Sequence, residues 1–394
     1  MVKYFLHFTH LCYNTSMNYK IVFIVLLPLL LWLILHEKKF DQKELLIAAS
    51  LPKTSVMSEL GESVVEGVKA YFNYANNEKL LGDQTLRFIT LDDKYEPHLT
   101  RKNLEHFLTK ENIFSFFAFV GTPTVKNILP IFNKEEIPFF APFTGASFLR
   151  IQNNKHIINF RSSYKQEIEA HINYLHEQNC SRFAIFYQND EYGKDVYLSS
   201  IKLLKKHHLS LVAEGSYKRN TLSIRHAYYE IKKSKPDAII MIGAYKVNTL
   251  FINKAKEDKV FEKSYFSNIS FGNATAMVKA LNKDTSKILF SQVVPSYQNR
   301  ALPIVQEYHK VLREYNSSYE ANFISFEAFL AAKTLVLAIQ KAKKPLTHQG
   351  FLKALKSLPS DSLEGLTLKY QSTQLLNHVY LFSYEDQHFT KINP

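Results

Sequence analysis

The stretch FSFFAFVGTPTVKNILPIFNKEEIPFFAPFTG, residues 114–145, joins two short apolar runs through an amphipathic segment. The runs at 114–120 and 138–143 have the length and aromatic content of buried strands, whereas residues 125–136 place apolar side chains at helical spacing. A strand, a helix and a second strand in this order are typical of a βαβ unit with parallel strands. We therefore expect a parallel sheet covered by helices.

The same alternation continues on both sides of this unit. Upstream, the predicted strands 45–52 and 86–93 flank an amphipathic helix at 61–77. The series restarts downstream with a helix at 164–179 and a strand at 182–190. Two βα series of similar length predict an α/β protein with two similar Rossmann-like lobes.

The C-terminal part departs from the alternation. Two longer helices are predicted at 302–316 and 323–342, and a shorter one at 347–358. We expect a β-rich end after them, at 366–371 and 378–392.

Composition narrows the class of protein. The chain has 394 residues, 46% apolar and 22% charged, which are values of globular proteins with enough length for two domains. The net charge of +13 raises the alternatives of a nucleic acid, an anionic membrane or an acidic ligand as partner. Its lysines are scattered over amphipathic helices, as at Lys202, Lys205 and Lys206, without an arginine-rich tract. We interpret them as solvated helix faces and expect no nucleic-acid partner.

An apolar run of fifteen residues, 21–35, lies near the N-terminus. Its length suits the core of an export signal and is short for a membrane span. No small-residue cleavage site follows, so the sequence is compatible with a cleaved signal and with a retained anchor, and with a start at Met1 or at Met17. Lys38 and Lys39 on the far side weaken the positive-inside pattern. In either case the N-terminal segment 1–40 predicts that the rest lies in the periplasm.

Common catalytic and cofactor motifs are absent from the sequence. It contains no GxxxxGK[ST], no GxGxxG after a strand, no GxSxG and no HExxH. Cys12 and Cys180 have no CxxC partner. We therefore predict no cofactor, no metal site and no enzyme activity.

The ends of the predicted strands offer a binding site instead, because ligands of open α/β sheets bind beyond the carboxyl ends of the strands. We expect Thr122 to cap the helix through the amide of Val125, with Pro123 at the first helical position. The amide of Thr124 would then stay free at the positive end of the helix and accept a carboxylate.

The next strand end offers Thr144, Gly145 and Ala146, where Gly145 lets a backbone amide approach a ligand closely. In the second series, Tyr192 and Tyr245 each follow a strand. Their aromatic faces suit an apolar or cationic part of a ligand.

Five segments taken together resemble the type I periplasmic binding proteins, and most closely the leucine/isoleucine/valine-binding branch that serves ABC importers. They are 119–150, 159–167 (NFRSSYKQE), 183–193 (FAIFYQNDEYG), 239–245 (IIMIGAY) and 325–339 (SFEAFLAAKTLVLAI). The resemblance implies two lobes joined by three crossing strands, with the ligand held between them by hinge closure. It places lobe 1 at 44–163 plus about 294–360, and lobe 2 at 164–293 plus about 361–394.

The resemblance also implies roles for individual residues. Hydroxyls and amides of lobe 1 would hold a ligand carboxylate, and aromatic residues beyond the first crossing and in lobe 2 would contact the ligand. The implied ligand-binding set is Thr122, Thr124, Thr144, Gly145, Ala146, Tyr164, Tyr192 and Tyr245.

One residue departs from the family pattern. The glutamate that would hold a ligand ammonium is replaced by Ile269, which weakens the case for an amino acid and leaves a carboxylate or an amide equally open. Asp190 or Glu191 could substitute for that acid or could be turn residues. We expect a solute-binding protein that delivers a small polar ligand to an ABC permease; the alternative is a sensor that presents its closed form to a membrane receptor or kinase.

Overall fold

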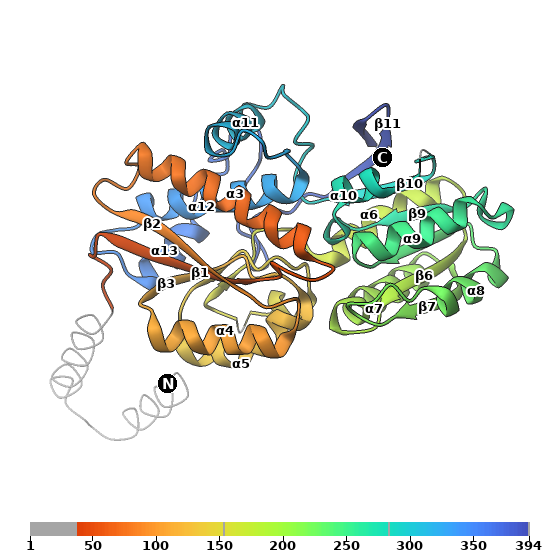
Figure 1. The fold of residues 1–394 in the computed structure, drawn as a ribbon, viewed down its shortest axis with the longest axis horizontal. Helices are drawn as coiled ribbons and strands as arrows, with labels where there is room; N and C mark the ends of the chain where they lie inside the picture. Colours follow the sequence, from red (N-terminus) through yellow and green to blue (C-terminus); the bar gives the residue numbers. More distant parts are fainter. Residues whose placement is uncertain (1–37, 153, 283, 393–394) are drawn as a thin grey trace, which may run out of the picture.

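The computed structural model describes residues 38–152, 154–282 and 284–392. The apolar run 21–35 and the prefix before it lie outside the described residues. The described chain forms two α/β lobes that lie side by side (Figure 1), which confirms the predicted fold class.

Lobe 1 contains a five-stranded parallel sheet in the order β2-β1-β3-β4-β5. All of β3 is buried, as expected for a strand with helices on both faces. Helices α3 and α12 pack together on one face, and α4 lies against α5 on the other (Figure 1). The strands are β1 (Glu44–Leu51), β2 (Thr85–Asp92), β3 (Ile113–Phe117), β4 (Phe139–Phe140) and β5 (Ile157–Ile158); the helices are α3 (Ser58–Asn77), α4 (Pro97–Lys110), α5 (Thr122–Glu135), η1 (Ser147–Arg150), α11 (Pro303–Tyr315), α12 (Phe323–Lys341) and α13 (His348–Lys356).

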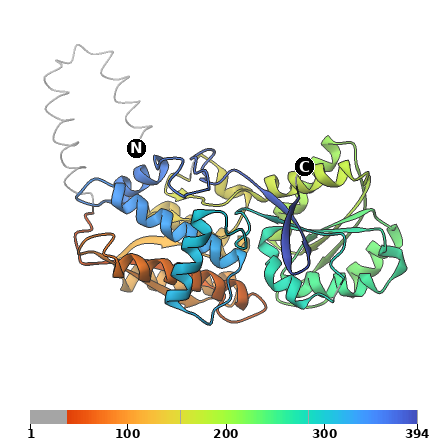
Figure 2. The same cartoon turned by 90° about the horizontal axis from the view of Figure 1, so that it is seen from above.

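Lobe 2 contains a seven-stranded sheet in the order β12-β11-β10-β9-β8-β6-β7. Strands β6 to β10 are parallel, and the C-terminal hairpin β11–β12 adds antiparallel to β10, at the top of lobe 2 in Figure 1 and in front of it in the view from above (Figure 2). The strands are β6 (Arg182–Gln188), β7 (Ser210–Tyr217), β8 (Ala238–Ile242), β9 (Tyr265–Asn268), β10 (Ile288–Gln292), β11 (Tyr380–Glu385) and β12 (His388–Ile392); the helices are α6 (Tyr164–Glu177), α7 (Glu191–Lys206), α8 (Arg225–Ser234), α9 (Tyr245–Lys256), η2 (Lys259–Phe261), η3 (Ser270–Gly272) and α10 (Ala274–Ala280).

Three segments connect the lobes: one from β5 to α6, one from β10 to α11 and one from α13 to β11. The first and third run beside each other, since the Leu375 amide donates to the Asn159 carbonyl at 3.0 Å and the Leu376 amide to the Phe160 carbonyl at 2.8 Å. The sequence prediction of a strand at 366–371 was wrong. This segment makes only isolated bridges, because it leads into the third connection and its backbone has no sheet neighbour to pair with.

Helix α12 is the most buried helix of lobe 1. Within the described residues it is the one helix whose length and hydropathy would allow it to cross a membrane, but 89% of its most apolar window is buried in the protein. Sixteen of its nineteen residues are buried between α3 and α13, so its apolar composition is that of a central core helix.

His171, on α6, makes the fold sensitive to acid. Its ring is fully buried and Nε2 lies 3.2 Å from the Asn268 carbonyl oxygen, and burial lowers its pKa from 6.5 to about 4. Below pH 6.5 His171 is protonated in the unfolded chain but stays neutral in the folded protein. The free energy of unfolding therefore decreases as pH falls from 6.5 to 4.

We expect the free energy of unfolding to fall between pH 7 and pH 5 by about 2 kcal/mol more in the wild type than in His171→Gln, which keeps a donor but does not titrate. Urea unfolding at both pH values measures the difference. His98→Gln, at an exposed histidine, is the control and should follow the wild type. Parallel pH curves for wild type and His171→Gln would show that His171 is protonated in the folded protein.

Candidate functional site

The carboxyl ends of the strands of both sheets meet at the junction of the lobes. On the lobe 1 side, α5 begins at Thr122 and its N-cap is Gly121, with φ 103°. The predicted cap was wrong, because the Val125 amide donates to the Gly121 carbonyl at 3.2 Å and Pro123 falls at the second helical position. Because Thr122 is not the cap, its hydroxyl bonds elsewhere and lies 2.7 Å from that of Thr144.

Thr124 follows within the first turn of α5. Its hydroxyl donates to the Gly121 carbonyl at 2.8 Å and also contacts the Val120 carbonyl, so this side chain fixes the loop and is not available to a ligand. The amides of a first helical turn have no helical carbonyl to pair with. The turn therefore keeps the anion-binding amides that the sequence predicts, but the threonine hydroxyl beside them is already engaged.

The loop after β4 carries Thr144, Gly145 and Ala146, which are buried. The Ala146 amide lies 3.3 Å from the Thr144 hydroxyl oxygen, and the Tyr164 amide donates to the Gly145 carbonyl at 2.9 Å. A Cβ at Gly145 would lie 2.6 Å from both the ring and the amide of Tyr164. Glycine is thus required here by the close approach of α6, which is a different reason from the ligand approach that we expected.

Four aromatic rings fill the centre of the junction; we call them the aromatic cluster (Tyr95, Tyr164, Tyr192 and Phe271). Phe271 of lobe 2 lies 4.8 Å from Tyr192 and 6.3 Å from both Tyr95 and Tyr164, measured between ring centroids. All four side chains are at most 1% exposed. The cluster brings together rings from the β2–α4 loop, α6, α7 and η3, and so joins the two lobes.

Within the aromatic cluster, the Tyr192 hydroxyl has no hydrogen-bond partner among the described residues. The Tyr164 hydroxyl makes no hydrogen bond of good geometry, although the Thr144 side chain and the Gly145 amide lie close enough to bond to it. Burial raises the pKa of Tyr164 to about 12 and that of Tyr192 well above 10. Both are therefore neutral donors at neutral pH. A buried hydroxyl without a partner costs free energy, so these two groups mark a place where a ligand acceptor would be stabilised.

Tyr245, the third predicted tyrosine, lies elsewhere. It is half-buried at the start of α9 and hydrogen-bonds to Glu59 at the start of α3; burial, and after it the bond to Glu59, raises its pKa. It therefore joins the lobes at the rim of the junction, and the structure does not bring it into the aromatic cluster.

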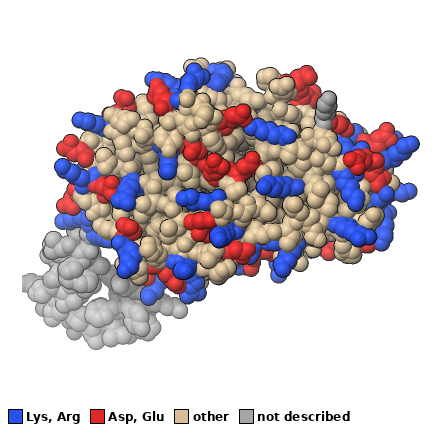
Figure 3. Space-filling view, viewed as in Figure 1, with Lys and Arg blue, Asp and Glu red and all other residues tan. Residues whose placement is uncertain are grey.

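Polar contacts at the rim hold the lobes together. The Arg219 guanidinium lies 2.8 Å from the Glu96 carboxylate, and the Ser147 amide donates to Asp195 at 3.1 Å. Figure 3 shows acidic and basic side chains interspersed where the two lobes meet. The described arrangement is therefore the closed one.

A buried ion pair lies beside the aromatic cluster. Arg161, in the first connection between the lobes, pairs with Glu327 of α12 at 3.1 Å and contacts the Ser270 hydroxyl. The Ser270 amide and hydroxyl both donate to Glu167 of α6, at 2.8 and 3.0 Å. Burial raises the pKa of Glu327 to about 7, although Arg161 opposes the shift. These four residues link the first connection to both lobes.

Ile269 precedes this network and is 2% exposed, so the position of the missing glutamate is apolar. Asp190 does not replace the acid. It is the N-cap of α7, accepting from the amides of Tyr192 and Gly193 at 3.0 and 3.3 Å, and Gln188 donates to it at 2.6 Å. Glu191 is exposed. Asp190 is therefore a turn residue that caps α7. Neither Asp190 nor Glu191 offers an unpartnered carboxylate at the aromatic cluster.

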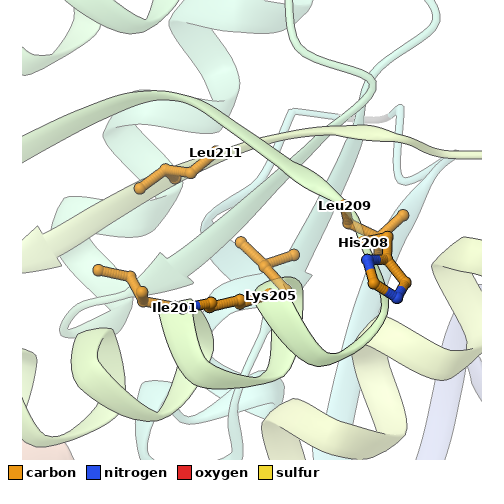
Figure 4. A pocket seen from close by; sticks show the side chains of 6 residues that line it. Ile201, Lys205, His208, Leu209 and Leu211 are labelled. Carbon is orange, nitrogen blue, oxygen red and sulfur yellow. The ribbon is translucent and has the colours of Figure 1, made fainter.

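Surface hollows do not coincide with the junction. A hollow of about 400 Å³ lies between the end of α7 and the start of β7, on lobe 2 (Figure 4), lined by Ile201, Leu204, Lys205, His208, Leu209 and Leu211. A second lies along α3 and β2 of lobe 1. Neither contains a predicted site residue, whereas the aromatic cluster contains two of them, Tyr164 and Tyr192.

Sequence reasoning missed Tyr95, Phe271 and Arg161. Tyr95 follows β2 and Phe271 follows β9, so the rule that located Thr122 would have found both if it had been applied to every strand end. Arg161 gave no signal, because an arginine in a connecting segment is usually exposed and its partner Glu327 is 166 residues away.

Comparison with known proteins agrees with this geometry. Residues 44–388 match the family described as periplasmic binding protein. A possible leucine/isoleucine/valine-binding protein from Rhodopirellula baltica has 28% identity and a TM-score of 0.84, over 90% of this chain and 98% of its own. No curated protein sequence matches significantly.

Two less similar structures share the fold. A branched-chain amino acid ABC transporter protein from Thermus thermophilus with bound valine has 15% identity and a TM-score of 0.80, over 90% of this chain and 96% of its own. A solute-binding protein from R. palustris in complex with benzoate has 14% identity and a TM-score of 0.77, over 89% and 95%.

Proposed function

Since the chain belongs to the periplasmic binding protein family, we propose that it captures a small carboxylate without an ammonium group between its lobes and delivers it to an ABC importer. The observation that carries this proposal is the pair of buried hydroxyls of Tyr164 and Tyr192, of which that of Tyr192 has no partner among the described residues. Both are donors, and a carboxylate is a group that only accepts hydrogen bonds.

Further donors support an anionic ligand group. The first turn of α5 contributes amides and the positive end of the helix dipole. Nη1 of Arg161 is buried without a hydrogen-bond partner among the described residues. The Arg161 guanidinium also lies near enough to Tyr164 and Tyr192 to interact electrostatically with both. The hydroxyls of Thr122 and Thr144 now bond to each other, so we propose that they reorient to share the ligand.

The absence of an ammonium ligand follows from the carboxylates near the aromatic cluster. Glu327 is paired with Arg161, Glu167 accepts from Ser270, and Asp190 caps α7. Taking any of them for an ammonium would break an existing contact. The rings of Tyr95 and Phe271 suit an apolar or aromatic ligand body instead, and the fold accommodates such a carboxylate in the benzoate complex from R. palustris.

Closure supplies the mechanism. A ligand bound to one lobe recruits the other, and the rim contacts of Arg219 with Glu96 form only when the lobes meet. The ligand shifts this equilibrium only by its preference for the closed form. We further propose that residues 21–35 stay uncleaved and tether the protein to the inner membrane, which would also serve presentation of the closed form to a membrane receptor.

A thermal-shift series tests the ligand class. We expect aromatic and aliphatic carboxylates at millimolar concentration to raise the Tm, with about 2.7 kcal/mol of added stability at a concentration of 100 Kd. Each carboxylate is compared with its amide and with its α-amino acid counterpart. A response to α-amino acids alone would overturn the assignment and would mean that a carboxylate now paired is released on binding.

A further inference from the structure

The described chain enters lobe 1 at the end that lies away from lobe 2, beside α13 (Figure 1). Residues at the start of α13 hold this segment in place. Lys39 forms a bridge with Thr347, and the Phe40 amide donates to the Leu346 carbonyl at 2.9 Å. The Phe40 ring is 1% exposed and lies 4.7 Å from the ring of His348. The N-terminal segment therefore leaves the protein at a defined place on its surface.

Six exposed lysines surround this place, and we call them the basic end: Lys38, Lys39, Lys155, Lys343, Lys344 and Lys356. Contacts with shared neighbours bring them together. Lys38 lies 5.3 Å from the Phe40 ring, and Lys344 bonds to Gln84, which donates to the Phe40 carbonyl. Besides burial, the charges of Lys155 and Lys356 lower the pKa of His156, so both lysines lie near it. In the same way, Lys38 and His156 lower the pKa of His348.

None of these six lysines has a carboxylate partner within the described part of the chain. Some lysines elsewhere on the surface pair with acids, as Lys206 does with Glu169 and Lys256 with Asp284, so the basic end differs by its density of lysines and not by their being unpaired. The acidic groups nearest the basic end do not neutralise it, because Glu136 faces His156 at 4.0 Å and Glu44 is paired with Arg87. Asp41 and Asp83 are exposed acids at the same end, beside Phe40 and beside Gln84, the partner of Lys344, and the six lysines outnumber them. The result is a local excess of positive charge.

We propose that the basic end lies against an anionic phospholipid surface. This inference rests on the proposed tether: the apolar run 21–35 ends three residues before Lys38, so a bilayer that holds this run lies next to the lysines. Each lysine near an anionic bilayer contributes about 1 kcal/mol. The unusual positions of Lys38 and Lys39 beyond the apolar run are thereby explained, since they belong to the contact with lipid.

The contact would also orient the protein. Strand β1 runs from the basic end to the lobe junction, and its eight residues span about 26 Å. The rim of the junction therefore stays clear of the bilayer and open to ligand.

Flotation of the full chain with vesicles tests the proposal. Vesicles of neutral phosphatidylcholine are compared with vesicles that contain phosphatidylglycerol, because the apolar run partitions into both and its contribution cancels in the ratio. We expect a preference of at least about 10-fold for phosphatidylglycerol at low salt, lost at high salt. Replacing Lys155, Lys343, Lys344 and Lys356 with glutamine should abolish most of it.

The matched control replaces four exposed lysines of lobe 2 with glutamine: Lys165, Lys202, Lys205 and Lys263. It removes the same charge and should retain the preference. An equal loss in both variants would assign binding to the net charge of the whole protein and overturn the proposal, as would equal flotation of the wild type on both vesicles. Unfolding curves for both variants establish that they remain folded.

Discussion

Replacing Arg161 with methionine is expected to lower the free energy of unfolding by about 3–5 kcal/mol at pH 8. Arg161 is 1% exposed, pairs with Glu327 at 3.1 Å and contacts the Ser270 hydroxyl. Methionine fills much of the same volume but leaves the Glu327 carboxylate buried without a cation. The measurement is urea unfolding monitored by circular dichroism.

The loss should depend on pH in a definite direction. Burial raises the pKa of Glu327 in the folded protein, and removing Arg161 raises it further because Arg161 is the group that opposes the shift. The folded protein then holds a proton that the unfolded chain releases above about pH 4.5, so the stability of the variant decreases as pH rises. We expect the difference from the wild type to be largest at pH 8 and to shrink toward pH 5.

A second substitution separates charge from packing. In Arg161→Met with Glu327→Gln, the buried carboxylate is gone, and most of the lost stability should return. Glu169→Gln is the control, because Glu169 pairs with Lys206 at the same 3.1 Å but at the surface, with side chains 35% and 64% exposed; it should cost at most about 1 kcal/mol. An equal loss at pH 5 and pH 8, without recovery in the double variant, would attribute the effect to packing.

Local sequence signals predicted the fold better than the site. The alternation of apolar runs and amphipathic segments is a local property, and the parallel sheets follow from it. The segment 366–371 has the composition of a strand, but whether it pairs depends on which backbone lies beside it, and this is decided by the third connection between the lobes. Local pattern carries no information on that choice.

For the candidate site, the sequence predicted where polar residues lie but not which groups they contact. Strand ends located Thr122, Thr144 and Tyr192, because the polarity of parallel strands brings their carboxyl ends together. The partner of each side chain was not predictable. Thr122 was expected to bond within its own helix and instead bonds to Thr144, 22 residues away, because the loops after β3 and β4 are adjacent in the sheet.

The double substitution Tyr164→Phe with Tyr192→Phe is expected to weaken binding of the proposed carboxylate about 100-fold. Each hydroxyl would donate to a charged acceptor, and two such hydrogen bonds contribute about 3 kcal/mol. In the described closed arrangement the same hydroxyls are buried, and that of Tyr192 has no partner, so removing them should leave stability unchanged or raise it by about 1 kcal/mol. Affinity and stability should therefore change in opposite directions. Calorimetric titration with the carboxylate that gives the largest thermal shift, together with urea unfolding, measures both quantities.

Tyr308→Phe provides the matched control, since Tyr308 is equally buried but its hydroxyl lies 2.6 Å from that of Ser325 in lobe 1. It should lose about 1 kcal/mol of stability and keep the wild-type affinity, the reverse of the double variant. Wild-type affinity in the double variant would place the ligand away from the aromatic cluster. A clear loss of stability in the ligand-free double variant would show that the two hydroxyls are already satisfied, and the argument for a carboxylate at this position would then fail even if the protein binds one elsewhere.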